Sequence, residues 1–156
     1  MKGIKPANWS DLQRELDLWA ESGLTATWWW RDDDAVAASA ELDRLLAMAP
    51  EHLALAVIPN SLAPSLVDAL ASFPGVSVLQ HGFAHLNRAA EGERKTEFPD
   101  SRDPDLIDTD LKAGWNRLSG AFGRRLLPVL TPPWNRIGKA ALPRLRDLGF
   151  AGLSRF

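Results

Sequence analysis

The amino-acid sequence predicts an α/β protein built from parallel βα units. Short apolar runs of strand length alternate along the chain with segments whose apolar residues recur at helical spacing. The strand-like runs are apolar throughout instead of at every second position, which is typical of strands buried on both faces of a parallel sheet. With 156 residues, 46% of them hydrophobic, the chain is long enough for a single domain with one core.

The first expected element is an N-terminal helix within residues 1–23, and the βα repeats then occupy residues 25–156 of the same domain. Ser10 and Gln13 match a capping box at the start of the helix, and Gly23 is its expected stop. Apolar residues follow the box at helical spacing: Leu12, Leu16 and Trp19. This spacing predicts an opening helix.

The segment TATWWWRD, residues 25–32, predicts the first strand. It is rich in β-branched and aromatic residues and too continuous for a half-exposed strand, so we expect it to be buried. Those of the tryptophans at 28–30 that point inward are expected in the core. The three aspartates at 32–34 then fall at the carboxyl end of the strand, where adjacent like charges oppose folding unless a cation compensates them.

The later elements follow from the same two patterns. Strands are expected over residues 53–58, 76–80 and 126–130, and a fifth begins within FAGLS at 150–154. Pro128 interrupts the fourth strand and argues against a central position for it. Four helical patterns separate these strands: Leu42, Leu45, Leu46 and Ala49 after the cap Ser39; Leu66, Ala69 and Leu70 after Pro64; Leu111, Trp115, Leu118 and Phe122; and Leu142, Leu145 and Leu148 before Gly149.

One long segment, residues 87–104, fits neither pattern. It is polar, charged and broken by prolines, which predicts a surface loop. Loops of this length within a domain tend to be functional or disordered.

Composition excludes several classes of protein. The formal net charge is −2 with both signs interspersed, so we expect no nucleic-acid partner and no attachment to a membrane surface. The absence of cysteine excludes disulfides and thiolate chemistry. The N-terminus has no apolar segment typical of a signal peptide, and no apolar run reaches the roughly 20 residues that span a bilayer. A cytoplasmic protein is therefore expected.

Polar residues gather where three of the expected strands end, at 32–34, 81–85 and 131–135. Ligands of parallel α/β folds bind at the carboxyl ends of the strands, so these segments are expected to share one rim. His81 and His85, separated by a glycine that lets the chain turn, could join a carboxylate in a two-histidine, one-carboxylate metal set. The alternative is a buried structural histidine, a surface histidine and a solvated acidic loop.

The order of these motifs resembles the polysaccharide deacetylase family, the NodB homology domain of carbohydrate esterase family four. That family has an Asp-Asp pair after its first strand, a His-Ser/Thr-x-x-His motif after its third and an Arg-x-Pro segment further on. The counterparts here are RDDDA, HGFAH and TPPWN, and the resemblance covers roughly residues 25–153. It implies a divergent member with a metal-dependent hydrolase activity toward the N-acetyl group of a carbohydrate.

The resemblance also implies an incomplete or distorted (β/α) barrel of the polysaccharide deacetylase type, shortened at its C-terminus. An eightfold barrel needs about 250 residues, and at roughly 30 residues per βα unit this chain supplies about five units. Either it is a fragment of a longer protein, or it is a shortened barrel that covers its open edge, for instance as a homo-oligomer.

Residue roles follow from the resemblance by position. Asp33 matches the catalytic base and Asp34 a metal ligand, with the pair Asp32 and Asp33 as the alternative register. His81 and His85 match the two histidine ligands. The metal is then a divalent transition metal, with zinc expected first and cobalt, nickel or manganese as alternatives.

The substrate side of the resemblance is less regular. Trp134 and Pro133, together with Arg31, are expected to contact the sugar, and a backbone N–H near Trp134 to stabilise the oxyanion. The arginine that orients the base in the family has no direct counterpart, which leaves Arg31 or Arg136 for that role. No histidine follows His85 to serve as the family's late acid.

Two other functions remain open at this point. A catalytically degenerate member of the same fold would bind metal or sugar without hydrolysis. An unrelated metal-dependent phosphoesterase barrel could also place aspartate and histidine at strand ends, but it would need a second metal and the chain has few spare ligands.

Overall fold

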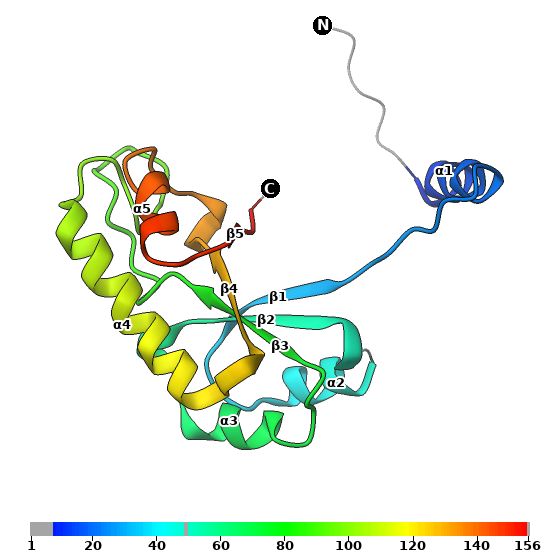
Figure 1. Ribbon diagram of the computed structural model, residues 1–156, viewed down its shortest axis with the longest axis horizontal. Helices are drawn as coiled ribbons and strands as arrows, with labels where there is room; N and C mark the ends of the chain where they lie inside the picture. Colours follow the sequence, from blue (N-terminus) through cyan, green and yellow to red (C-terminus); the bar gives the residue numbers. More distant parts are fainter. Residues whose placement is uncertain (1–7, 49, 156) are drawn as a thin grey trace, which may run out of the picture.

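The computed structural model of the protein describes residues 8–48 and 50–155. Five parallel strands form one sheet in the order β1-β2-β3-β4-β5, so each strand lies beside its neighbour in sequence. Figure 1 shows α2, α3, α4 and α5 around this curved sheet and α1 apart from it. The expected α/β class with parallel βα units is confirmed.

The strands and helices have the following bounds. The strands are β1 (Trp30–Ala35), β2 (Leu53–Val57), β3 (Ser77–His81), β4 (Leu126–Thr131) and β5 (Gly152–Leu153). The helices are α1 (Trp9–Glu21), α2 (Ala40–Met48), α3 (Pro64–Leu70), α4 (Pro104–Phe122) and α5 (Leu142–Asp147). Among the described residues, no helix is both long enough and apolar enough to cross a membrane.

The core lies between the sheet and helices α2 to α5. Alternate residues of the central strands, such as Leu55 and Val78, point toward the helices and are fully buried. They pack against the apolar faces of the helices, on which buried leucines recur at helical spacing. The large apolar residues buried in these helices are Leu42 and Leu46 in α2, Leu66 and Leu70 in α3, Ile107, Leu111, Leu118 and Phe122 in α4, and Leu145 in α5.

Leu118→Ala is expected to destabilise the protein by about 2–5 kcal/mol, because it leaves a cavity at a fully buried site of the core. Leu106→Ala on the same helix is the matched control, since that leucine is 55% exposed. Urea unfolding followed by circular dichroism measures both variants. Equal stabilities of the two variants would contradict the packing described for α4.

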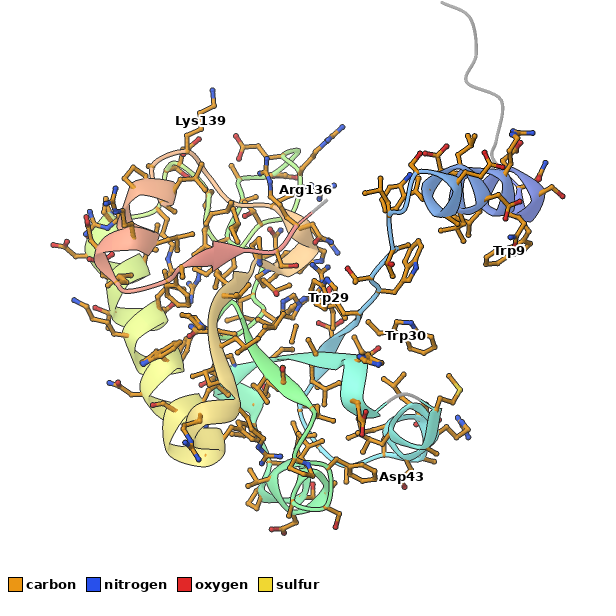
Figure 2. All side chains as sticks on the ribbon, turned by 45° about the vertical axis from the view of Figure 1, so that its right-hand side comes forward. Trp9, Trp29, Trp30, Asp43, Arg136 and Lys139 are labelled. Carbon is orange, nitrogen blue, oxygen red and sulfur yellow. The ribbon has the colours of Figure 1, made fainter. Side chains whose placement is uncertain are left out.

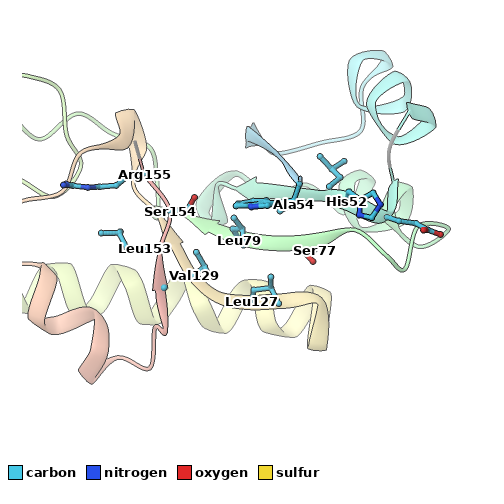
Figure 3. A pocket seen from close by; sticks show the side chains of 13 residues that line it. His52, Ala54, Ser77, Leu79, Leu127, Val129, Leu153, Ser154 and Arg155 are labelled. Carbon is cyan, nitrogen blue, oxygen red and sulfur yellow. The ribbon is translucent and has the colours of Figure 1, made fainter. Parts of the chain in front are cut away.

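The opposite face of the sheet is concave and largely uncovered. Three buried apolar residues lie at its centre, Ala54, Ala56 and Leu79, and the partly buried Val129 packs against them. Figure 3 shows the groove of about 590 Å³ that runs over this face between Leu127, Leu153 and His52. In a closed barrel this face would be the interior, so the structure is an open arc of such a barrel.

Helix α1 begins two residues earlier than the expected capping box. Its N-cap is Asn8, whose side chain accepts the N–H groups of Ser10 and Asp11, while Asp11 accepts the N–H of Asn8. The Ser10–Gln13 box was therefore a wrong prediction, because asparagine with aspartate three residues later satisfies the same donors. None of the residues of α1 is buried.

The first strand also departs from expectation. It spans residues 30–35 instead of 25–32, so the aspartates lie inside the strand and not after it. The tryptophans are not in the core: Trp28, Trp29 and Trp30 are 63%, 58% and 46% exposed, and Figure 2 shows Trp29 and Trp30 beside the open part of the sheet. A continuous apolar run predicts burial on both faces, but β1 is an edge strand and no described element covers its inner face.

The fourth strand lies inside the sheet, between β3 and β5, although it contains Pro128. The ladder accommodates the proline through an irregularity: Val78 and Gln80 of β3 pair with Leu126 and Leu130, so β4 has two extra residues at this point. The Pro128 carbonyl accepts the N–H of Ala151 and so supports β5. The expectation that Pro128 argues against a central position was wrong here, because a bulge removes the conflict.

The remaining elements match their predictions within a residue or two. The Ser39 hydroxyl caps α2 by accepting the N–H of Leu42, and Ala49, expected on this helix, lies outside the described residues. Residues 87–103 form a long loop without helix or strand. The loop is not wholly at the surface, however, because Thr96, Glu97 and Phe98 are buried.

Candidate metal centre and active site

Three side chains converge at the carboxyl edge of the sheet. The Oδ1 atom of Asp34 lies 3.1 Å from Nε2 of His81 and 3.2 Å from Nε2 of His85. All three ligand atoms lie within 4.8 Å of one another. Asp34 comes from β1, His81 ends β3 and His85 follows in the next turn. Side chains from β1 and β3, which lie on either side of β2, therefore meet at the carboxyl edge of the parallel sheet.

A bulge in β1 directs Asp34 toward the histidines. Asp32 pairs with Leu55 and Ala35 pairs with Val57, so β1 has one residue more than β2 over this interval. Asp34 takes up the extra residue with a φ of 66°, a left-handed conformation that aspartate adopts more readily than most residues. Since strand neighbours otherwise face opposite sides, the bulge lets Asp33 and Asp34 face the same site.

The hydrogen bonding of His81 prepares its other nitrogen for a metal. His81 is 2% exposed, and its Nδ1 lies 2.9 Å from the backbone carbonyl of Thr131. A carbonyl can only accept, so this contact assigns a proton to Nδ1, and in the neutral ring the lone pair of Nε2 is then directed toward Asp34. A lone pair facing a carboxylate oxygen is repulsive, so the arrangement calls for a positive charge between the two atoms.

The donor set and its spacing fit a transition metal. Zinc binds histidine nitrogen and carboxylate oxygen at about 2.0–2.2 Å, so two such ligands on one ion lie roughly 3 Å apart when their angle is about 100°. The two nitrogen–oxygen separations of 3.1 and 3.2 Å agree with this spacing. Three protein ligands leave coordination positions open, as catalytic metal sites require.

Asp33 is bound by Arg31 in a two-pronged ion pair. Nε and Nη2 of Arg31 donate to the two carboxylate oxygens of Asp33 at 2.8 and 3.1 Å. The same guanidinium donates to Oγ of Ser154 at 2.7 Å and to Oδ1 of Asn135 at 3.0 Å. Arg31 thus joins β1 to the turns after β4 and β5 and fixes the carboxylate of Asp33, the residue before the candidate metal ligand Asp34.

Asp32 occupies a different environment from its two neighbours. By strand alternation it points away from Arg31 and Asp33. All three aspartates border a hollow that Leu42 and Leu45 of α2 also line. Burial raises the pKa of Asp32, and the nearby charges of Asp33 and Asp34 raise it further. Asp34 belongs to the group that could hold a metal, Asp33 is paired with Arg31, and Asp32, the alternative candidate base, has neither contact.

Trp134 and Pro133 lie against the histidine turn. The Trp134 ring packs on His85 with centroids 4.5 Å apart, and its backbone has a φ of 55°. Pro133 is buried against Gly82, where a Cβ atom on that glycine would come within 2.8 Å of the proline ring. Trp134 is half-buried and borders the site, whereas Pro133 supports the turn from behind.

Sequence reasoning gave no role to three residues of this region, although one of them, Asn135, belongs to the polar segment 131–135. Asn135 and Ser154 hold Arg31, and Glu97 holds the turn that carries His85. No spacing or motif distinguishes Ser154 or Glu97, and the segment 131–135 did not indicate a contact between Asn135 and Arg31. Only the positions of neighbouring strand ends, which bring the loops together, reveal these contacts.

Comparisons with known proteins found similarity in structure only. No family model matches the sequence, and no curated protein matches it significantly. The deacetylase PplD of Streptococcus pyogenes, solved with acetate, superposes with a TM-score of 0.60 at 15% identity, over 92% of this chain and 62% of that one. This chain has the fold of a carbohydrate deacetylase.

Two further solved structures share this fold. A family 4 carbohydrate esterase from Streptomyces lividans, in complex with acetate, has a TM-score of 0.59 at 17% identity, covering 80% of this chain and 59% of that one. A family 4 acetyl xylan esterase from Clostridium thermocellum, with a cobalt ion, has a TM-score of 0.55 at 13% identity, covering 72% and 51%. The chain therefore spans between 51% and 62% of the lengths of these proteins.

Proposed function

We propose that this protein is a metal-dependent hydrolase that removes an acetyl group from an N-acetylated carbohydrate. The observation that carries the proposal is the convergence of Asp34, His81 and His85 beside the arginine-bound Asp33. The deacetylase-like fold supports it, as do the acetate and cobalt in the solved structures that share this fold.

Asp34, His81 and His85 would hold the metal, and zinc suits a set of two imidazole nitrogens and one carboxylate best. When bound, a zinc ion lowers the pKa of a bound water to about 7 and polarises a carbonyl oxygen. The Thr131 carbonyl keeps the His81 ring in the orientation and tautomer that such a ligand needs. The Trp134 ring packs against His85 and restricts the orientation of its ring.

Asp33 is the proposed general base, held at the metal site by Arg31. A base must be fixed within hydrogen-bond reach of the water it deprotonates. The two-pronged pair with Arg31 fixes the plane of the Asp33 carboxylate, and Ser154 and Asn135 fix the guanidinium in turn. Arg31 therefore acts as a positioning residue in this proposal, the role that the sequence left open between Arg31 and Arg136.

The proton donor for the leaving amine is not a histidine of this chain. His52, the one histidine outside the metal set, precedes β2 and lies at the opposite edge of the sheet from Asp34. In this proposal, once Asp33 has taken the proton from water, it donates that proton to the amine. One carboxylate then serves as base and acid in successive steps.

Acetate release tests the proposal directly. We expect the metal-free protein to be inactive toward an oligomer of N-acetylglucosamine and to release acetate, with a free amine on the sugar, after one equivalent of zinc is added. Acetate is measured by an enzyme-coupled assay and the sugar product by mass spectrometry. Saturable oligomer binding without acetate release would instead favour the catalytically degenerate function.

The phosphoesterase alternative receives little support from the structure. Two-metal phosphoesterases need a second cluster of ligands about 3.5–4 Å from the first. Within residues 8–48 and 50–155, Asp34, His81 and His85 form the one group of acidic and histidine side chains close enough to hold an ion. Release of phosphate from a phosphate ester, with no acetate release, would be needed to revive it.

A further inference from the structure

Glu97 is a fully buried carboxylate in a loop that the sequence suggested would be exposed. It is 0% exposed, and its neighbours Thr96 and Phe98 are 9% and 0% exposed. No arginine or lysine of the described chain forms an ion pair with its carboxylate. A buried charge is costly unless strong hydrogen bonds compensate it, so its contacts require an explanation.

Both oxygens of Glu97 bind the turn between the two histidine ligands. Oε2 accepts the N–H of Phe83 at 3.1 Å, and Oε1 accepts the N–H of Ala84 at 2.8 Å. These two peptide groups lie within the segment that joins His81 to His85. Charge-assisted hydrogen bonds to backbone N–H groups are stronger than neutral ones, so Glu97 is a strong restraint on this segment.

Other groups complete the restraint on the same turn. The Gly82 N–H donates to the Thr131 carbonyl at 3.1 Å, and the Gly82 carbonyl accepts from the Gln80 side chain at 3.0 Å. The Phe83 carbonyl accepts the N–H of Asn60 at 2.9 Å. Five hydrogen bonds therefore hold this turn, and Glu97 accepts two of them, from the N–H groups of Phe83 and Ala84.

Space as well as hydrogen bonding links Glu97 to the turn. Gly82 has a φ of 57°, and a Cβ atom there would collide with Oε2 of Glu97 and with the ring of Pro133. Glycine is therefore required where the deacetylase motif has serine or threonine. His85 itself has a φ of 55°, a conformation that persists only when its surroundings hold it.

The segment around Glu97 is anchored at its other side to the turn after β4. The Thr96 hydroxyl donates to the carbonyl of Arg136 at 2.9 Å and accepts the N–H of Phe98 at 3.1 Å. Arg102 donates to the backbone carbonyl of Glu97 at 3.4 Å. The long loop is thus tied between the two turns that border the metal site.

We propose that Glu97 is a positioning residue that presets the His81–His85 turn for metal binding. Its effect on metal affinity rests on the function proposed above, but its restraint of the turn does not. Glu97 holds the Phe83 and Ala84 peptides in place before a metal ion binds. The conformational entropy of ordering His85 is then lost on folding and does not reduce the affinity for the ion. Within the described residues, the carboxylate of Glu97 hydrogen-bonds to the Phe83 and Ala84 peptides and to no side chain of the candidate metal set.

Glu97→Gln tests the proposal with a minimal change in shape. The amide keeps one acceptor oxygen but places an NH₂ group against the N–H of Phe83 or Ala84, where two donors oppose each other. We expect zinc affinity, measured by competition with a chromophoric chelator, to fall by about 10–100-fold, as for other residues that orient metal ligands. Glu91→Gln, an exposed glutamate of the same loop, should leave the affinity unchanged.

Hydrogen exchange of the metal-free proteins separates this inference from the function. The Phe83 and Ala84 amides should be protected in the wild type and in Glu91→Gln, and should lose protection in Glu97→Gln while the amides of β2 keep theirs. Rapid exchange of both amides in the wild type would overturn the inference without any variant. So would unchanged protection in Glu97→Gln. A wild type that has protected amides but binds no zinc would refute the metal site and leave the role of Glu97 in the turn intact.

Discussion

The Asp34→Ala, His81→Ala double variant is expected to lose its metal almost completely. The wild type, purified without a histidine tag and supplied with zinc, should retain about one ion per chain, because three ligands converge at one point. Removal of two of the three leaves a single imidazole, which binds zinc weakly. Metal per chain, measured by mass spectrometry after gel filtration, gives the result.

A matched double variant guards against nonspecific effects. Asp17→Ala with His52→Ala removes the same two residue types from exposed positions outside the cluster, and should retain the ion. Equal metal content in all three proteins would place the ion elsewhere in the chain. Absence of metal from the wild type as well would make the aspartates of RDDDA a structural feature of β1 and its bulge.

The Asp33→Asn variant is expected to keep the metal and lose turnover. The amide preserves the shape of the side chain and can still accept one hydrogen bond from Arg31, but it cannot take a proton. General-base catalysis contributes about 10²–10⁴-fold, so kcat for acetate release should fall at least about 100-fold. Metal content should stay near that of the wild type.

The same assay decides between the two registers of the aspartate pair. Asp43→Asn, at an exposed position of α2, serves as the control for a lost carboxylate. If Asp32→Asn abolishes turnover while Asp33→Asn does not, the base is Asp32 and the geometry around Arg31 has another purpose. Loss of metal in Asp33→Asn would instead make Asp33 part of the metal set.

The segments that meet at the carboxyl edge of the sheet were predictable, because the topology of parallel strands alone determines them. Apolar runs that alternate with helical patterns imply parallel neighbours, and parallel neighbours bring their carboxyl ends together. That rule alone placed the aspartates of β1 near His81 and His85. The hydrophobic pattern did not indicate which of the three aspartates faces the histidines. That depends on the bulge in β1, for which the sequence has no recognisable signal.

The burial expected for the tryptophans at 28–30 was wrong because it depends on tertiary contacts that the local pattern does not contain. A continuous apolar run indicates that both faces of a strand could be buried. It does not indicate whether another element covers the face that points away from the helices. Trp28 and Trp29 precede the first paired residue of β1, Trp30, and no described element packs over them. Glu97 was missed for a related reason, because a charged residue in a polar loop is expected at the surface unless a distant turn supplies its partners.

The bulge at Asp34 also bears on how this site could change in evolution. Substitutions alter one side chain at a time, but deletion of one codon between Asp32 and Ala35 would restore regular alternation along β1. Either Asp33, the proposed base, or Asp34, the proposed ligand, would then point to the face of the sheet that the helices cover. Ala35 would point to the site in its place. Length in this short interval should therefore be under stricter selection than the identity of any nearby residue outside the site.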